Sequence, residues 1–261
     1  MILDRFRISD KVALVTGAGR GIGRGIAQAL AEAGADVVCA ARTLEQIEEA
    51  AEQIRGLGRR ALAIPCDVNV PSQLENVVSQ TLKEFGRVDV LVNNAGGSTP
   101  TPVLQLSDKA FEEAFHFNVT TALNLSRQVL AHMVEGEGGS IINISSAMGH
   151  MVEPGFVAYG TAKAALAHMT RLMASEFAPK VRVNAIAVGA TLTDALSTFV
   201  KGDLRKQMEE LTPMGRLGEV EDIAAMALYL ASPASSWVTG KVFEVDGGAV
   251  ASNWPIKIPA Y

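Results

Sequence analysis

The sequence predicts a doubly wound α/β domain with a seven-stranded parallel sheet flanked by helices on both faces. Short β-rich runs alternate with longer stretches of helical period, which is the pattern of a parallel sheet covered by helices. Several of the runs are nearly all apolar, as strands buried on both faces should be. The 261 residues show no internal repeat and no Pro/Gly/Ser-rich linker, so we expect a single domain over residues 1–261.

The individual elements follow from local composition. The expected strands are 11–16, 36–41, 60–66, 88–93, 140–145, 181–188 and 241–245. The expected helices, which carry apolar residues at helical spacing, cover roughly 22–33, 44–56, 71–85, 108–134, 157–178 and 219–231. The least regular stretches, 97–107, 147–156 and 189–215, each follow an expected strand. Loops at the carboxyl ends of strands build the ligand crevice of an open α/β sheet, so we expect the site there.

Composition excludes several classes of function. The formal net charge is −5 and the basic residues are scattered, which argues against a nucleic-acid partner. No apolar run is long enough to span a bilayer, and charged residues interrupt the first ten positions, so we expect a cytoplasmic protein with no membrane partner. Cys39 and Cys66 lie in or beside apolar runs and are expected to be buried thiols. The four histidines lack metal-ligand spacing, and we predict no metal site.

A glycine-rich turn joins the first strand to the first helix. Its spacing is TGxxxGxG, with Gly17, Gly19, Gly21 and Gly23 at the crossing. A plain connection could hold the same glycines. Placement between an apolar strand and an amphipathic helix favours binding of a dinucleotide pyrophosphate at the helix N-terminus, so Arg20 and Ile22 in the same turn are also candidate cofactor contacts.

The end of the second strand favours NADP over NAD. An acidic residue there would hold the ribose of NAD and repel an added phosphate, but the strand ends on Ala41 and Arg42. Asp36 stands at the opposite end of the strand. Arg42 and Arg20 could both face a 2′-phosphate. The alternative is that both are solvated surface arginines, and NAD is then the runner-up.

Four motifs in order resemble the classical short-chain dehydrogenase/reductase family. They are "TGAGRGIG" after the first strand, "NNAG" at 93–96, a serine at 146 and "YGTAK" at 159–163. The resemblance covers nearly the whole chain, and within the family the chain resembles bacterial hydroxysteroid dehydrogenases and 3-oxoacyl reductases. It implies a Rossmann-type domain, usually a homotetramer, that oxidises alcohols or reduces carbonyls with a nicotinamide cofactor.

The resemblance assigns roles to individual positions. Its catalytic group falls on Ser146, Tyr159, Lys163 and Asn118. Its further cofactor contacts fall on Asp67, Val68, Asn94, Ala95, Gly96, Tyr159, Lys163, Gly189, Thr191 and Thr193. One departure stands out, because Val188 precedes Gly189 where the family usually has proline. A residue without the proline ring leaves this loop less rigid.

The catalytic residue types suit hydride transfer to a carbonyl. The oxygen gains negative charge and needs a proton donor, which Tyr159 would supply. A Lys163 ammonium one turn away is expected to lower the tyrosine pKa, and Ser146 could orient the substrate oxygen. The resemblance adds a ribose contact for Lys163 and a water held by Asn118. Ser146 could instead cap the next turn, and Asn118 could simply bond backbone.

We therefore expect an NADP(H)-dependent oxidoreductase that interconverts a small-molecule secondary alcohol and its ketone. A catalytically silent NADP(H)-binding sensor or scaffold is the alternative; an extended-type epimerase would need a longer chain. Residues 189–215 are expected to form a mobile lid, in which apolar residues such as Leu192 and Phe199 either pack or touch substrate. The mouth is expected at Met148, His150, Met151 and Phe156. The apolar tail 249–261, with Trp254 and Tyr261, is expected to dock across a subunit interface.

Overall fold

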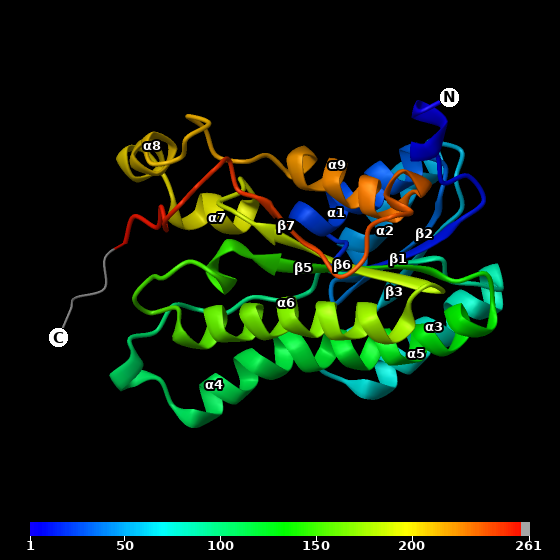
Figure 1. The fold of residues 1–261 in the computed structure, drawn as a ribbon, viewed down its shortest axis with the longest axis horizontal. Coiled ribbons are helices and arrows are strands. Elements are labelled where there is room, and N and C mark those ends of the chain that lie inside the picture. The colour runs from blue at the N-terminus through cyan, green and yellow to red at the C-terminus, as the bar shows by residue number, and fades with distance from the viewer. Residues whose placement is uncertain (257–261) are drawn as a thin grey trace.

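One parallel seven-stranded sheet runs through the protein (Figure 1). The computed structural model describes residues 1–256, without the side chains of Ala195 and Phe199. The strands, ordered β3-β2-β1-β4-β5-β6-β7 across the sheet, are β1 Val12–Thr16, β2 Asp36–Ala41, β3 Ala61–Pro65, β4 Val90–Asn93, β5 Gly139–Ser146, β6 Val181–Val188 and β7 Val242–Val245. All seven expected strands are confirmed, with ends shifted by at most two residues. The order reverses between β1 and β4, and such switch points carry ligand crevices.

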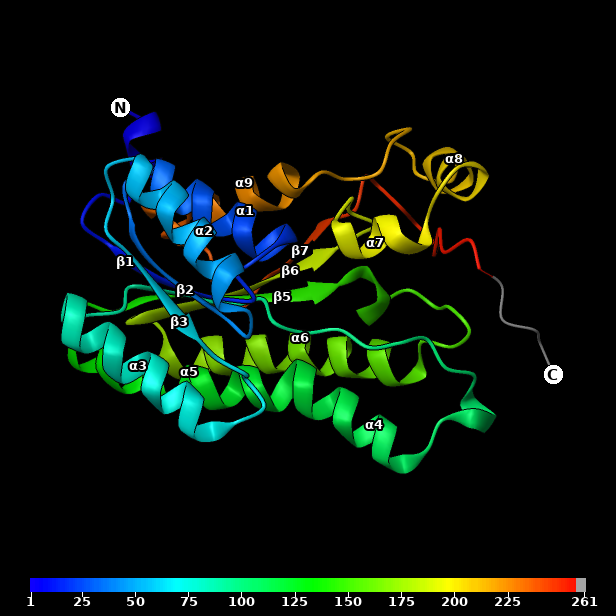
Figure 2. The same cartoon turned by 180° about the vertical axis from the view of Figure 1, so that it is seen from behind.

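Helices cover both faces of the sheet (Figures 1 and 2). One face carries α1 Gly21–Glu32, α2 Leu44–Gly56 and α9 Val220–Ala231. The other carries α3 Pro71–Phe85, α5 Thr121–Glu135 and α6 Val157–Phe177, with α4 Asp108–Phe115 leading into α5. Two shorter helices, α7 Asp194–Phe199 and α8 Asp203–Glu210, lie at the carboxyl end of the sheet. No helix among residues 1–256 is long and apolar enough to cross a membrane.

Alternation along the central strands explains their apolar sequences. Val15 and Val92 pack into the core under α1 and α9, whereas Leu14 and Leu91 pack into the core under α3 and α5. Successive strand side chains point to opposite faces. Because both faces are covered, most side chains of both sets are apolar, and all five residues of β1 are buried.

The helix expected over 108–134 is interrupted. A π-helical turn, His116–Thr120, separates α4 from α5. Asn118 stands in this turn, and its side-chain amide donates to the Ala114 carbonyl at 2.8 Å. A side chain that bonds the carbonyl four residues back competes with the helical ladder. The helix predicted over 108–134 is therefore confirmed, with one π-helical turn inside it.

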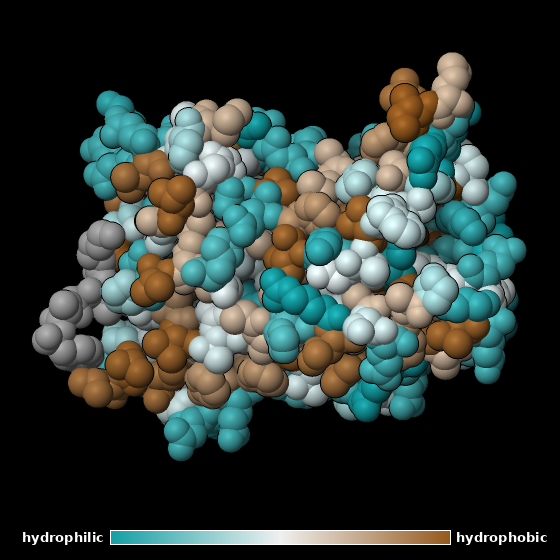
Figure 3. Space-filling model, in the orientation of Figure 1, coloured by the Kyte–Doolittle hydropathy of each residue, from teal (hydrophilic) through white to brown (hydrophobic). Residues whose placement is uncertain are grey.

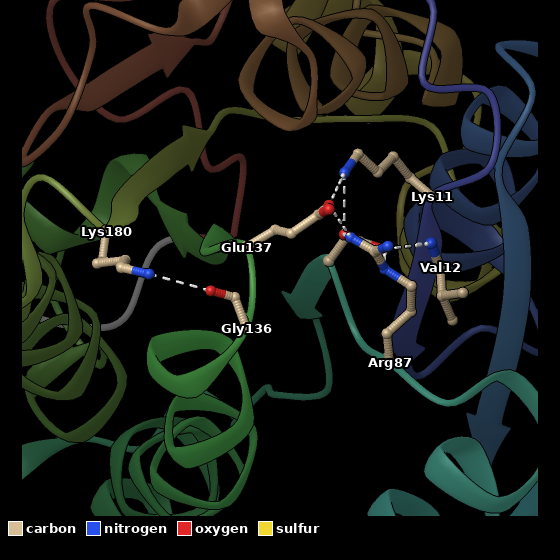
Figure 4. Close-up of polar contacts among 7 residues, drawn as sticks. Lys11, Val12, Arg87, Gly136, Glu137 and Lys180 are labelled. Atoms are coloured by element: carbon tan, nitrogen blue, oxygen red, sulfur yellow. Dashed lines mark hydrogen bonds and ion pairs between the residues drawn. The ribbon is translucent and has the colours of Figure 1, made fainter.

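A polar cluster ties the amino ends of the strands together on the side opposite the cleft (Figure 4). Asp89, which is buried, accepts hydrogen bonds from the Val12 amide at 2.9 Å and from Lys11 Nζ at 3.2 Å. Arg87 Nε donates to the same carboxylate at 2.8 Å. Hydrogen bonds to Asp89 and to the exposed Glu137 raise the pKa of Arg87. The cluster fixes the start of β1 against the start of β4.

Asp89→Asn should lower the free energy of unfolding by about 1–3 kcal/mol, because it removes charge-assisted bonds around a buried strand amide. Urea denaturation would measure the loss. Glu137→Gln is the matched control: the Glu137 side chain is 71% exposed, and exposed ion pairs contribute little to stability. Equal midpoints for Asp89→Asn and the wild type would show that the cluster does not stabilise the fold.

Candidate active site

A cleft of about 630 Å³ opens at the carboxyl ends of the strands. Nearly every residue predicted for the site lines it: Gly17, Gly19, Arg20, Gly21, Ile22, Gly23, Arg42, Asp67, Val68, Asn94, Ala95, Gly96, Ser146, Tyr159, Lys163, Gly189, Thr191 and Thr193. Asn118 is the exception and lies behind the wall. The fold thus brings the glycine turn, the end of β2 and the catalytic candidates to one surface.

The glycine turn is locked onto the loop after β4. Thr16 Oγ1 accepts from the amides of Asn94 at 3.0 Å and Ala95 at 3.1 Å. The Asn94 side chain donates back to the Thr16 carbonyl at 2.9 Å. A Cβ on Gly23 would stand 2.3 Å from the Gly17 oxygen, so a side chain has no room there. Asn94 therefore shapes the glycine turn through backbone contacts, and Thr16 is a residue of this junction that the sequence analysis missed.

The first turn of α1 presents unbonded amides to the cleft. Arg20 precedes the helix and makes no side-chain cap. The first amides of a helix have no partner within it and favour anions. Together with the close-packed glycines, this turn fits a dinucleotide pyrophosphate.

The two arginines predicted for the cofactor are exposed at the rim of this half of the cleft. Neither Arg20 nor Arg42 forms an ion pair with a carboxylate in the described part of the chain. Asp36, by contrast, is held at the far end of β2 by Arg59 at 2.9 Å and by the Arg60 amide at 3.0 Å. No carboxylate of β2 therefore reaches the cofactor half.

Ser146, Tyr159 and Lys163 converge from β5 and the first turns of α6. Ser146 ends β5, and its hydroxyl accepts from the Met148 amide at 3.2 Å, the capping bond that was one of its expected alternatives. Lys163 Nζ lies 5.7 Å from the centre of the Tyr159 ring and donates to the Ile144 carbonyl at 2.8 Å. The three side chains face the same part of the cleft.

Burial governs the protonation of this group. It raises the pKa of Tyr159, while a side-chain hydrogen bond with Ser146 acts in the opposite direction. It also lowers the pKa of Lys163 to about 8, because a buried ammonium loses its hydration. We expected Lys163 to lower the pKa of Tyr159, and this is wrong for the cofactor-free protein. Removal of the phenol from water has the larger effect and raises the pKa.

Asn118 bonds backbone on two sides. Its amide donates to the Gly97 carbonyl at 2.9 Å and to Ala114, and its oxygen accepts from the Gly97 amide at 2.9 Å. A Cβ on Gly96 would stand 2.7 Å from Asn118 Oδ1 and 3.0 Å from Lys163 Nζ. Asn118 is thus a positioning residue for the loop beside Lys163. This agrees with the alternative given above, in which Asn118 simply bonds backbone. The water-holding role remains a prediction.

A buried polar chain supports these elements and was also missed. Asn93 at the end of β4 donates to Asn143 on β5 at 2.9 Å, and Asn143 donates to Thr170 on α6 at 2.9 Å. Ser145 Oγ donates to the Lys163 carbonyl at 3.0 Å. Polar residues inside otherwise apolar strand runs are the signal that could have found them. These buried hydrogen bonds fix α6, and with it Tyr159, to the sheet.

The half of the cleft in which we expect the substrate, called the substrate half below, is mostly apolar. Met148, Met151 and Phe156 line it as expected, and Trp254 and Asn253 of the tail join them. In the lid region, Met208 lines the cleft, whereas Leu192 packs against the buried Val200 cluster. The Phe199 side chain and Tyr261 lie outside the described residues.

His150 is not among the residues that line the cleft. It meets Glu244 and Asp246 at the end of β7, with one ligand atom of each within 4.8 Å of the others. Linear spacing of the histidines gave no sign of this cluster. Its members are exposed or half-exposed, and we assign no metal to them.

Comparison with known proteins identifies the family. A family model described as enoyl-(acyl carrier protein) reductase matches residues 17–250. The 7α-hydroxysteroid dehydrogenase of Escherichia coli strain K12 is 39% identical over 249 residues, which cover 95% of this chain and 97% of that protein. This chain belongs to the short-chain dehydrogenase/reductase family.

Other members of the family match over similar lengths. An uncharacterized oxidoreductase from Mycobacterium tuberculosis is 52% identical over 261 residues, which cover 99% of each chain. A solved structure of 7α-hydroxysteroid dehydrogenase complexed with NADH and 7-oxo glycochenodeoxycholic acid has a TM-score of 0.92 and 38% identity, covering 95% of this chain and 97% of that one. The Rossmann-type α/β fold of the family is thus shown for this chain.

In this short-chain dehydrogenase/reductase, Lys163→Met should stabilise the cofactor-free protein by about 1–3 kcal/mol at pH 7, because it removes a buried charge. Lys163 is charged in both folded and unfolded states below pH 8, and neutral in both above 10.5. The loss of stability caused by burying the ammonium is therefore complete below about pH 8 and disappears between pH 8 and 10.5. Unfolding curves at pH 7, 9 and 10.5 should show the gap closing; a gap independent of pH would contradict burial as the cause.

Proposed function

We propose that this protein is an NADP(H)-dependent oxidoreductase that interconverts a secondary alcohol and a ketone, with Tyr159 as general acid and base. The observation that carries the proposal is the convergence of Ser146, Tyr159 and Lys163 beside a cleft whose other half is a glycine-lined helix N-terminus. A nicotinamide cofactor in that half would supply or accept the hydride. The remaining steps belong to this chain's own residues.

In ketone reduction, the Tyr159 hydroxyl donates its proton to the carbonyl oxygen as negative charge develops there. Ser146 holds the same oxygen by a hydrogen bond and orients it toward the phenol. Burial raises the Tyr159 pKa, so the phenol keeps its proton at neutral pH. This supports reduction as the direction at neutral pH, with alcohol oxidation gaining as pH rises and the phenolate forms.

Lys163 supplies positive charge next to the phenol. Its pKa of about 8 leaves it mostly protonated at neutral pH. The charge stabilises the phenolate left after proton donation. Its reach toward the ribose, and a water link through Asn118 to solvent, belong to the same proposal.

The preference for NADP(H) is supported by Arg42 and Arg20 at the rim, by their lack of described carboxylate partners, and by the position of Asp36 at the other end of β2. A 2′-phosphate would gain charge-assisted bonds from either arginine. NAD is the runner-up, since the solved 7α-hydroxysteroid dehydrogenase was complexed with NADH.

We further propose a cytoplasmic homotetramer with a single domain, in which residues 189–215 act as the substrate lid. Apolar substrates are supported by the methionines of the mouth. A silent NADP(H)-binding sensor is the competing function. It would bind NADPH and turn over none of a broad panel of carbonyl compounds.

Tyr159→Phe should reduce ketone turnover by at least about 100-fold, the usual range for losing a general acid. NADPH affinity should change little, because the ring stays in place. Steady-state kinetics and NADPH fluorescence titration measure the two quantities separately. Full activity in the variant would refute the proposed mechanism.

Arg42→Ala should weaken NADPH binding by about tenfold or more, the loss expected for a charge-assisted bond. NADH binding should stay close to that of the wild type, because NADH lacks the 2′-phosphate. Arg24→Ala is the matched control, since Arg24 lies on the same helix as the glycine turn but bonds Glu49 at 2.7 Å. Equal losses for both cofactors would rule out phosphate recognition by Arg42.

A further inference from the structure

We propose that Trp254, latched in place by Asn253, closes the substrate half of the cleft and selects ketones whose carbonyl lies within an apolar ring system. The inference rests on the proposed function, because it names the substrate class of that same site. Asn253 and Trp254 belong to the tail expected at a subunit interface, and both line the cleft of their own chain. The interface contact remains a prediction.

Two glycines turn the chain back over the cleft after β7. Gly247 and Gly248 have φ angles of 71° and 80°, a left-handed conformation that favours glycine. The Gly248 amide donates to Asp246 Oδ1 at 2.9 Å, and the Gly247 carbonyl accepts from the Met214 amide at 3.1 Å. The tail therefore leaves the sheet alongside the segment that follows α8 (Figure 1).

A buried latch fixes the tail to the lid. Asn253 is 8% exposed, and its amide donates to Thr212 Oγ1 at 2.9 Å. Thr212 in turn donates to the Met208 carbonyl at 2.8 Å. Met208 is itself buried and lines the cleft. The latch thus joins two walls of the substrate half, α8 and the tail.

Three aromatic rings run from the tail to the proton donor. Trp254 meets Phe156 edge to face, with ring centres 5.4 Å apart at 80°. Phe156 meets Tyr159 in the same manner at 6.3 Å and 63°. Both distances lie in the range of attractive aromatic pairs. Trp254 thus follows Phe156 in a row of rings that begins at Tyr159, where it can cover the part of a ring system that extends away from the carbonyl.

The chemistry of this half favours an uncharged apolar ring. Met148, Met151 and Met208 supply adaptable, polarizable surface. Among the described lining residues, the cations are Arg20 and Arg42 on the cofactor side and Lys163 in the catalytic group. No described cation remains to hold an anionic group beside the carbonyl. Hydrophobic side chains also gather at the end of the molecule where α7 and α8 lie (Figure 3).

A series of ketones with increasing ring size tests the selection: acetone, cyclohexanone and 2-decalone. Trp254→Ala should lower kcat/KM for 2-decalone by about tenfold or more, mainly through KM, as expected for lost apolar contact. The value for acetone should change far less. Trp237→Ala is the matched control, because Trp237 is 98% exposed. Equal changes for all three ketones, or none, would overturn the proposal.

Binding without turnover separates this proposal from the proposed function. The chain has two tryptophans, so Trp237→Phe leaves Trp254 as the sole tryptophan emitter. Titration of this variant with 2-decalone in the presence of NADP should change the Trp254 emission. A change without turnover of any ketone would support the site and contradict the oxidoreductase. An unchanged emission up to the solubility limit of 2-decalone would overturn the site.

The latch has its own pair of variants. Thr212→Val keeps the shape but removes the acceptor of Asn253, and should raise KM for 2-decalone with little effect on acetone. Thr212→Ser keeps the hydroxyl and should restore the wild-type preference. A Thr212→Val variant that loses kcat equally for every ketone, with no rescue by serine, would reduce the latch to a purely structural contact.

Discussion

The site depends on the close approach of two backbone turns at the switch point of the sheet. β1 and β4 are parallel neighbours, with Val15 beside Val92, so the turns that follow them emerge side by side. Thr16 and Asn94 form hydrogen bonds across the junction. Gly23 packs so closely against Gly17 and Asn94 that a side chain would not fit. This contact sets the direction of α1, and with it the free amides that suit a pyrophosphate.

A second constraint is the burial of Lys163, which the fold tolerates at a cost in stability. Lys163 is 3% exposed, and its ammonium donates to one described carbonyl, that of Ile144. Burial pushes the pKa of Lys163 down and that of Tyr159 up. The same removal from water that weakens the fold keeps the phenol protonated and makes the nearby charge effective. In the proposed mechanism, stability and catalysis therefore oppose one another at this position.

Most of the fold and much of the cleft could be predicted from the sequence, for local reasons. The run 181–188 is a strand in the structure as expected, because its β-branched residues and its length are properties of the segment itself. The π-turn around Asn118 could not be predicted, since the amide also bonds Gly97, 21 residues away. The contact of Trp254 with Phe156 could not be predicted either, because 98 residues separate the two rings in the sequence.

The sequence by itself determined the order of strands and helices, the glycine turn and the Ser146, Tyr159 and Lys163 spacing, because each is encoded within one short segment. Only the tertiary structure decided the balance of pKa values, the backbone role of Asn118 and the latch between Asn253 and Thr212, which are 41 residues apart. Each of these depends on desolvation or on a partner brought from elsewhere in the chain. Neither the desolvation nor the contact with a distant partner exists until the chain is folded.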